Sequence, residues 1–378
     1  MDVKEAVFEK IKERMRREVS HLLTIPVIFS LGSGAGRVLA GVDVSRIGAV
    51  KVAINSSIRD LKQIEGQVDL SIPCGDLGGS GMNPEKGRED YLEVVDVIPH
   101  IVEKACEAYG CEDPDVVVTI ASVGHGFGSG SLPEHVKAVK SSYPNTVHIV
   151  FAVTPFHFEG EGPMIRAYTS LKEAVKHITV FPLSNHIASL KLNVDPRKVK
   201  LSDVFNAINS HVVEVLNSLF DALTATEGIR MGMDRSDLMN MIQGEVGAIG
   251  MAKYQSLSGL TADKVLQDVA SSIYVKPVVG PDGAYGTYLV DSCEKVPLSL
   301  LNELSRLLVS RWMLKTRYLK PLILERDRLG STVLVILTNL LLRKHVEREL
   351  QSLVLGSEAG EYWSKSLAKK LKGLLSEH

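Results

Sequence analysis

The 378-residue sequence has no apolar run long enough to cross a bilayer. A membrane helix needs about 20 consecutive apolar residues, and the longest run here is VLVILTNLLL at 333–342. A short run of this kind predicts a buried strand instead. The N-terminal stretch, residues 1–19, also lacks the apolar segment of a signal peptide. We therefore expect a cytoplasmic protein.

Cysteine and excess charge are also scarce. The four cysteines show no CxxC spacing and no histidine partners at metal-ligand spacing. We expect reduced thiols and no metal site built by the protein alone. Lysine and arginine number 43 against 45 acidic residues, for a formal net charge of −2. Bulk charge therefore gives no sign of a nucleic-acid partner.

Near-continuous apolar runs alternate with helical stretches, such as 91–109, through the first half of the chain. The runs lie at 26–31, 50–54, 116–121, 146–153 and 178–183. This alternation predicts an α/β fold with a doubly wound parallel sheet.

The second half has a different organisation. A long amphipathic helix is expected from Leu201, and then a smaller α+β unit with strands at 272–279, 287–292 and 332–338 and a helix at 298–314. We divide the chain into an N-terminal amphipathic helix (1–24, periodic over 3–19), a nucleotide domain (25–200), a central helix (201–224), a C-terminal domain (225–345) and a helical tail (346–378).

Glycine-rich segments follow three of the expected strands, at 32–36, 75–81 and 124–130. Glycine lets a ligand approach the backbone closely, and successive N–H groups can then converge on an anion. In an open α/β sheet these loops meet at the carboxyl edge, where ligands bind. We read them as loops that wrap one polyphosphate.

Two common phosphate motifs do not fit. No glycine is followed by Lys-Ser or Lys-Thr, as a P-loop requires. A dinucleotide fingerprint begins at Gly32 and Gly34, but Arg37 stands where its third glycine belongs. A dinucleotide oxidoreductase therefore remains only a distant alternative.

Six motifs, in order, resemble those of the FtsZ/tubulin superfamily, over residues 25–245. They are GSGAG (32–36), AINSSIRDL (53–61), GGSGMNPEKGRE (78–89), GHGFGSG (124–130), TPFHFEGEG (154–162) and SDVFNAIN (202–209), with MDRSDL (233–238) resembling the loop after the central helix. The resemblance is closer to the FtsZ-like proteins of prokaryotes, archaea among them, than to eukaryotic tubulin.

The resemblance implies that the ligand is GTP or GDP, bound with Mg²⁺. Phosphate contacts are expected from the three glycine-rich segments. Gly79, Ser80 and Gly81 would close over the γ-phosphate. A helix that opens after Ser131 would direct its N-terminal dipole at the phosphates. The other implied phosphate residues are Gly32, Ser33, Gly34, Ala35, Gly36, Arg37, Gly124, His125, Gly126, Phe127, Gly128, Ser129 and Gly130.

Four further residues complete the implied pocket. Glu159 would contact the ribose and Arg166 would stand in for an arginine that Pro163 replaces. Phe205 would stack on guanine and Asn209, one turn later on the same helical face, would hydrogen-bond it. The alternative for Phe205 is a core residue of the central helix.

Asp234 and Asp237 are the catalytic candidates that the resemblance implies. In the family this loop enters the site of the next subunit in a head-to-tail filament, where the acids activate water. The alternative is a helix cap, which explains Asp234 more easily than Asp237.

Several positions depart from the family pattern. His125 and Phe127 replace a glycine and a threonine in the phosphate loop, and Ser57 stands where FtsZ has an aspartate near magnesium. Gly232 replaces an asparagine in the catalytic loop. These changes affect hydrolysis more than binding, so the alternative function is a GTP-binding paralogue that neither polymerises nor hydrolyses and acts as regulator or scaffold.

The last eighteen residues, EYWSKSLAKKLKGLLSEH, form a basic amphipathic pattern. Such a helix either packs on its own domain or docks on a membrane or a partner, including another FtsZ-like protein. Self-assembly, head to tail, is the principal partnership that we expect.

Overall fold

The computed structural model describes residues 23–45, 47–191, 200–225, 227–275, 278–280, 283–315, 319–342 and 344. The leading helix predicted over 3–19 and the tail helix predicted within 346–378 lie outside these residues. All four cysteines lie within them and are free thiols. Among the described residues, no helix combines the length and the apolar character needed to span a membrane.

An 11-stranded sheet runs through both halves of the molecule, in the order β3-β2-β1-β4-β5-β6-β8-β11-β9-β10-β7. The first six strands in that order are parallel. They are β1 (Val27–Leu31), β2 (Val50–Asn55), β3 (Leu70–Pro73), β4 (Val116–Ser122), β5 (Val147–Thr154) and β6 (Val180–Ser184).

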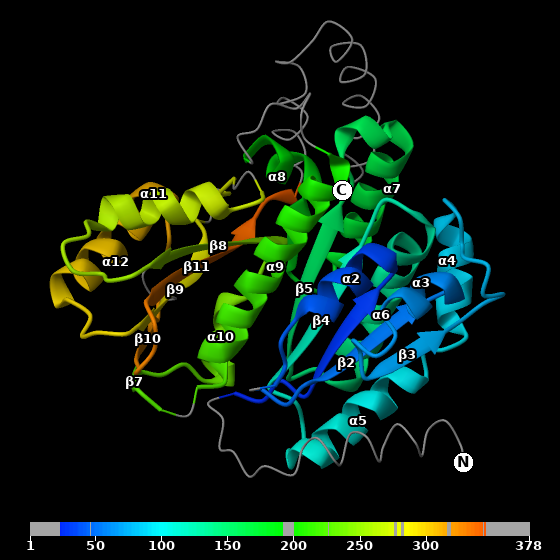
Figure 1. The fold of residues 1–378 in the computed structure, drawn as a ribbon, viewed down its shortest axis with the longest axis horizontal. Coiled ribbons are helices and arrows are strands. Elements are labelled where there is room, and N and C mark those ends of the chain that lie inside the picture. The colour runs from blue at the N-terminus through cyan, green and yellow to red at the C-terminus, as the bar shows by residue number, and fades with distance from the viewer. Residues whose placement is uncertain are drawn as a thin grey trace, which may run out of the picture.

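The remaining strands make a mixed sheet, seen at the left of Figure 1. They are β7 (Ile229–Met231), β8 (Val246–Tyr254), β9 (Tyr285–Ser292), β10 (Leu322–Glu325) and β11 (Ser331–Leu340). The two halves join through one parallel pair, Val180 with Val246. Pro182, which has no backbone N–H to donate, follows two residues later in β6, and the pairing with β8 does not continue past it. The predicted doubly wound fold with a smaller α+β unit is confirmed.

Helices cover both faces of the sheet. One face carries α4 (Pro84–Leu92), α5 (Val97–Tyr109), α6 (Gly126–Ser142), α7 (Glu161–Ala174), α11 (Ala262–Ser272) and α12 (Leu298–Trp312). The other carries α2 (Ser33–Gly41), α8 (Asn185–Lys191), α9 (Leu201–Leu223) and α10 (Arg235–Met241), with α3 (Ile58–Gln63) beside β2. Apolar strands that are buried on both sides, such as VIFSL in β1, follow from this covering.

Two of the expected elements are wrong. The helical stretch over 91–109 is two helices, because α4 ends at Leu92 and α5 begins at Val97. Pro99 cannot donate to a carbonyl four residues back, so it is accommodated in the first turn of a new helix. The strand expected over 272–279 is also absent from the described part of that segment: α11 extends to Ser272, and only Val279 pairs, in an isolated bridge with Leu340.

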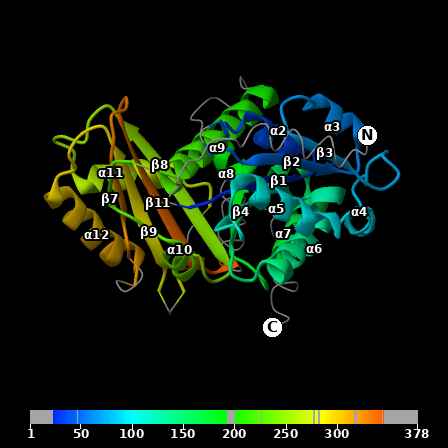
Figure 2. The same ribbon diagram turned by 90° about the horizontal axis from the view of Figure 1, so that it is seen from below.

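The central helix α9 lies between the two halves (Figures 1 and 2). Its buried residues, Val212, Leu216, Leu219 and Phe220, keep helical spacing and pack into the core.

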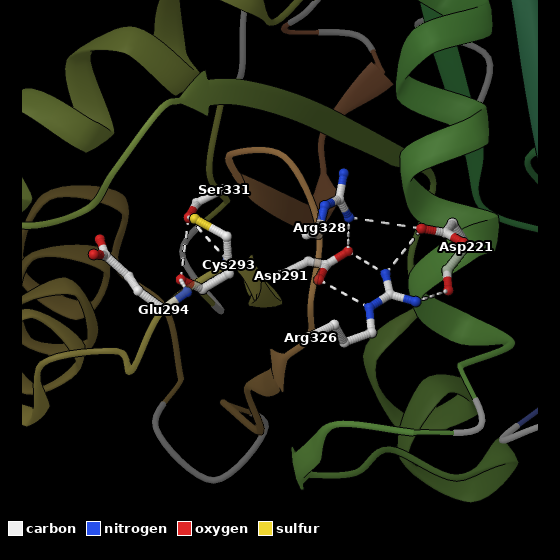
Figure 3. Close-up of polar contacts among 8 residues, drawn as sticks. Asp221, Asp291, Cys293, Glu294, Arg326, Arg328 and Ser331 are labelled. Atoms are coloured by element: carbon white, nitrogen blue, oxygen red, sulfur yellow. Dashed lines mark hydrogen bonds and ion pairs between the residues drawn. The ribbon is translucent and has the colours of Figure 1, made fainter.

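Near its end, Asp221 accepts a hydrogen bond from Arg326 at 2.8 Å. Arg326 and Arg328 also bind the carboxylate of Asp291 in β9, which is 2% exposed (Figure 3). This ion cluster fixes the helix end to the C-terminal sheet.

Candidate functional site

A cleft of about 740 Å³ opens at the carboxyl ends of the parallel strands. The order of the sheet reverses between β1 and β4, which is the point where open α/β sheets bind ligands. Fourteen of the predicted site residues line this cleft. They are Gly32, Ser33, Gly34, Arg37, Gly79, Ser80, Gly81, His125, Gly126, Phe127, Gly128, Glu159, Phe205 and Asn209.

The phosphate end is formed by two helix N-termini rather than by long loops. Helix α2 begins at Ser33 and α6 at Gly126, so the helix expected to open after Ser131 already begins five residues before Ser131. A Cβ atom on Gly128 would overlap the carbonyl oxygen of Ser122 at the end of β4. Glycine is therefore required for the start of α6 to pack on the strand. The first turns of both helices line the cleft, and the positive dipole end of each helix favours an anion there.

Gly126 fixes a second close contact at this end. Its N–H donates to the carbonyl oxygen of Gly81 at 3.1 Å, and a Cβ atom would lie 2.6 Å from that oxygen. The segment of Gly79 to Gly81 therefore rests directly on the first residue of α6.

Six predicted phosphate and pocket residues do not line the cleft. They are Ala35, Gly36, Gly124, Ser129, Gly130 and Arg166. Ser129 accepts the N–H of Gly124 at 2.7 Å, and Arg166 donates to the carbonyl of Gly124 at 2.9 Å. Gly130 faces the backbone of α4 at Pro84. These contacts fix the conformation of the loop before α6 through residues that do not line the cleft.

His125 and Glu159 face each other across the cleft. The His125 Nε2 atom lies 3.1 Å from a Glu159 carboxylate oxygen, and Glu159 also accepts the N–H of Phe156 at 2.8 Å. Burial would raise the pKa of Glu159, but the bond from His125 and the Phe156 N–H outweigh it and lower the pKa. Glu159 is thus held as a carboxylate.

Phe127 does not fill the cleft as its size would allow. Its ring is 6% exposed and packs edge-to-face on Tyr91, with 6.4 Å between the ring centroids. The replacement of the family threonine therefore extends the core beneath α6.

At the other end of the cleft, Phe205 projects from the first turns of α9. It is 37% exposed and meets Phe156 edge-to-face at 5.2 Å, so it is not the core residue of the alternative interpretation. Asn209 lies one turn later on α9 and also lines the cleft. An aromatic face and an amide side by side suit a planar base with polar edges.

Part of the chain matches a known protein family. A family model described as Tubulin/FtsZ family, GTPase domain, matches residues 41–187. The tubulin-like protein CetZ of Pyrococcus abyssi is 29% identical over 240 residues, which are 60% of this chain and 61% of that protein. The cell division protein FtsZ of Buchnera aphidicola is 28% identical over 52% of this chain and 49% of that protein. These matches therefore span half to three-fifths of the relatives' own lengths.

Solved structures show the same fold over nearly the whole chain. A CetZ2 protofilament from Haloferax volcanii with GTPγS bound has a TM-score of 0.70 at 17% identity, over 92% of this chain and 99% of that one. An empty FtsZ dimer from M. jannaschii has a TM-score of 0.67 at 21% identity, over 89% of this chain and 92% of that one. The chain therefore has the tubulin/FtsZ fold, and its residues 41–187 match the GTPase-domain model of that family.

Asp234 and Asp237 lie away from the cleft. They begin α10, which follows the far end of α9 (Figure 1), whereas Phe205 and Asn209 lie near the start of that helix. A helix of 23 residues is about 35 Å long. The two acids therefore cannot act on a ligand in the cleft of their own subunit.

The two acids form a reciprocal capping box at the start of α10. Asp237 therefore has a capping role as clear as that of Asp234, contrary to the sequence interpretation. Its carboxylate also binds the ammonium group of Lys320.

Two buried polar groups in the cleft were missed from the sequence. Asn185 and Thr154 are 6% and 0% exposed, and among the described residues the Asn185 Oδ1 and Thr154 Oγ1 atoms have no hydrogen-bond partner. Buried polar atoms are costly unless they are paired, so both indicate contacts with a ligand. Each residue ends or directly follows a strand, and that position was the signal available in the sequence.

No group of three or more His, Cys, Asp or Glu side chains within the described ranges is arranged to hold a metal ion. A cation in this cleft would therefore need ligand oxygens from the bound molecule as well as from the protein.

Proposed function

We propose that the cleft binds GTP or GDP with Mg²⁺, and that copies of the chain assemble head to tail and hydrolyse GTP at the contact between them. The observation that carries this proposal is the combination of two helix N-termini at one end of the cleft with Phe205 and Asn209 at the other. The first suits a polyphosphate and the second suits a base. We assign 25–200 to the nucleotide domain, 201–224 to the central helix and 225–345 to the C-terminal domain.

Each group in the cleft has a distinct task in this proposal. N–H groups in the first turns of α2 and α6, other than that of Gly126, bind phosphate oxygens, and Gly79, Ser80 and Gly81 enclose the terminal phosphate. Glu159 accepts hydrogen bonds from ribose hydroxyls, since its lowered pKa keeps it charged. Phe205 stacks on guanine while Asn209 and Asn185 contact its polar edge. Mg²⁺, when bound, neutralises charge on the phosphates.

Hydrolysis needs a second subunit, because Asp234 and Asp237 lie at the opposite end of α9 from their own cleft. In a head-to-tail contact they would approach the terminal phosphate of the neighbour, orient a water molecule and accept its proton as it attacks phosphorus. The neighbouring solved structures, a dimer and a protofilament, support self-association as the mode of assembly.

The test is GTPase activity measured against protein concentration, with sedimentation in GTP and in GDP. Turnover per molecule should rise with concentration as contacts form, and protein should pellet preferentially with GTP. Turnover per molecule that is constant across concentrations, without pelleting, would contradict assembly-dependent hydrolysis.

A second candidate is a GTP-binding paralogue that does not hydrolyse GTP. Its supporting observation is that both catalytic candidates are already engaged, in a capping box and with Lys320. GTP binding without turnover in a pelleting preparation would favour this candidate.

A further inference from the structure

Asp60 is one of two carboxylates that line the cleft. The other cleft carboxylate, Glu159, faces His125 at 3.1 Å. Among the described residues, no Lys, Arg or His forms an ion pair with Asp60. An anion without a counter-ion, in a site suited to a polyphosphate, requires an explanation because like charges repel.

Side chains from three elements meet at Asp60. The hydroxyl of Ser33, the first residue of α2, donates a hydrogen bond to the Asp60 carboxylate. Asn55, the last residue of β2, donates from Nδ2 to the same hydroxyl at 3.2 Å and is 4% exposed. All three residues line the cleft beside Gly32 and Gly34. The carboxylate thus lies at the phosphate end.

Helix capping does not account for the carboxylate. Ser57 is the N-cap of α3 and its hydroxyl accepts the backbone N–H of Asp60. In a capping box, the third helical residue would accept the N–H of the N-cap in return. Here the Ser57 N–H donates to Oδ1 of Asn55 at 3.3 Å instead. The Asp60 side chain is directed to Ser33.

The donor set fits a small, hard cation. Carboxylate and hydroxyl oxygens are hard ligands of the kind that Mg²⁺ takes, and it is commonly held by one or two carboxylates together with phosphate oxygens of the substrate. Asn55 supports this pair, because its Nδ2 donates to the Ser33 hydroxyl while its Oδ1 accepts the Ser57 N–H. A divalent cation placed between Asp60 and a phosphate would turn a repulsion into two attractions.

We propose that Asp60 and Ser33, with Asn55 orienting the Ser33 hydroxyl, form the protein side of a Mg²⁺ site that phosphate oxygens of the bound nucleotide complete. This inference rests on the proposed function. The resemblance to FtsZ puts the expected aspartate at the position of Ser57. In this chain Ser57 caps α3, and the carboxylate comes from Asp60, one turn further on.

The test compares GTPγS affinity in excess Mg²⁺ and in EDTA, for the full chain and for Asp60→Asn. Asparagine can still accept the hydrogen bond from Ser33, so the change removes charge and keeps the local contact. Asp76→Asn is the matched control, because Asp76 precedes the segment that encloses the phosphates but is exposed, outside the cleft and paired with Lys86 at 2.7 Å.

We expect the two conditions to affect Asp60→Asn in opposite directions. In EDTA it should bind GTPγS more tightly than the unmodified chain, because a repulsive charge is gone. In Mg²⁺ it should bind less tightly, because a metal ligand is gone. The Mg²⁺-dependent gain, about tenfold or more in the unmodified chain and in Asp76→Asn, should fall toward one. If Asp60 had only a structural role, the substitution would lower GTPγS affinity equally in Mg²⁺ and in EDTA.

A second readout is the affinity of the protein–GTPγS complex for Mn²⁺, followed by the loss of the EPR signal of free Mn²⁺. Asp60→Asn should raise that Kd by about tenfold or more, while its circular dichroism and Tm stay close to those of Asp76→Asn. An unchanged Mg²⁺-dependent gain and an unchanged Mn²⁺ Kd would overturn the inference. Equal binding of GTPγS in Mg²⁺ and EDTA by the unmodified chain would also overturn it and leave nucleotide binding standing, whereas no binding in either condition would overturn the proposed function itself.

Discussion

Asp234 and Asp237 each accept the other's backbone N–H, at 2.8 Å for the Asp234 carboxylate and 3.0 Å for that of Asp237. The bonds use one oxygen of each carboxylate, and Lys320 binds the same Asp237 oxygen that accepts the N–H. Within the described structure, the other oxygen of each acid makes no hydrogen bond. A reciprocal cap therefore fixes the orientation of two carboxylates while leaving an oxygen of each for water.

The reciprocal cap makes Asp237→Asn a sharper test of catalysis than Asp237→Ala. The asparagine oxygen can still accept the Asp234 N–H, so α10 keeps its cap, whereas alanine would cost α10 about 1 kcal/mol. We expect Asp237→Asn to bind GTP and pellet normally but to lose about a hundredfold or more in turnover. Phosphate release in the pelleted fraction measures this. Normal turnover in Asp237→Asn would assign the acid to capping alone.

Lys320 is expected to control the titration of Asp237. Burial would raise the pKa of Asp237, but the bonds from Lys320 and the Asp234 N–H lower it. A lowered folded-state pKa contributes stability that is present above the unfolded pKa and is lost as pH falls through the folded pKa. Carboxyl NMR should give a pKa below the usual aspartate range in the unmodified chain and a higher one in Lys320→Met. Identical titrations would show that the ion pair contributes nothing in solution.

Gly126→Ala should weaken nucleotide binding by moving the segment of Gly79 to Gly81. The new Cβ atom would lie 2.6 Å from the Gly81 carbonyl oxygen. Overpacking of this kind costs about 1–3 kcal/mol, so we expect GTPγS affinity to fall about tenfold or more. The reason is steric crowding against the carbonyl oxygens of Ser80 and Gly81 rather than a positive φ, which Gly126 does not adopt.

Gly66→Ala is the control for a general glycine effect. Gly66 has a φ of +78° and nothing within 4 Å of its would-be Cβ atom, and it lies outside the cleft. It should lose about 1–2 kcal/mol of stability and keep its affinity for GTPγS. Equal affinities in the two variants would remove the role of Gly126 in shaping the phosphate site.

The cluster around Asp291 should dominate the attachment of α9 to the C-terminal sheet. Asp291→Asn leaves the guanidinium groups of Arg326 and Arg328 without their buried carboxylate (Figure 3), which should cost about 3–5 kcal/mol in urea unfolding. Glu214→Gln breaks an exposed pair with Lys253 that joins α9 to β8 and should cost about 1 kcal/mol or less. Similar losses in both variants would contradict this ranking.

The parallel sheet could be predicted because its strands are apolar runs buried on both faces, as in VIFSL and VVVTIA. The starts of α2 and α6 could not, because glycine is a poor helix former and GSGAG and GFGSG read as loops. Close packing decides the residue type there: Gly128 and Gly130 are glycines inside a helix because the Ser122 and Pro84 carbonyls leave no room for a Cβ atom.

Only those cleft residues that lie close together in the sequence could be predicted to share a surface. Phe205 and Asn209 lie one turn apart, so their common face follows from the sequence. Asn185, Thr154 and Asp60 come from separate segments, and only the sheet order brings their side chains to one cleft. The reciprocal bond of Asp237 with Asp234 was missed because sequence spacing predicts a cap without giving the direction of each side chain.

The most direct test of the central claim is the affinity of the full chain for GTP and for ATP, measured by equilibrium dialysis in Mg²⁺ with the Asn209→Ala variant alongside. Ser210→Ala, an exposed neighbour on α9 outside the cleft, is the control. We expect GTP to bind at least about tenfold more tightly than ATP, a preference of about 1.4 kcal/mol, and Asn209→Ala but not Ser210→Ala to lose that preference. Equal affinity for the two nucleotides, or a preference unchanged in Asn209→Ala, would contradict the assignment of this cleft to guanine nucleotides.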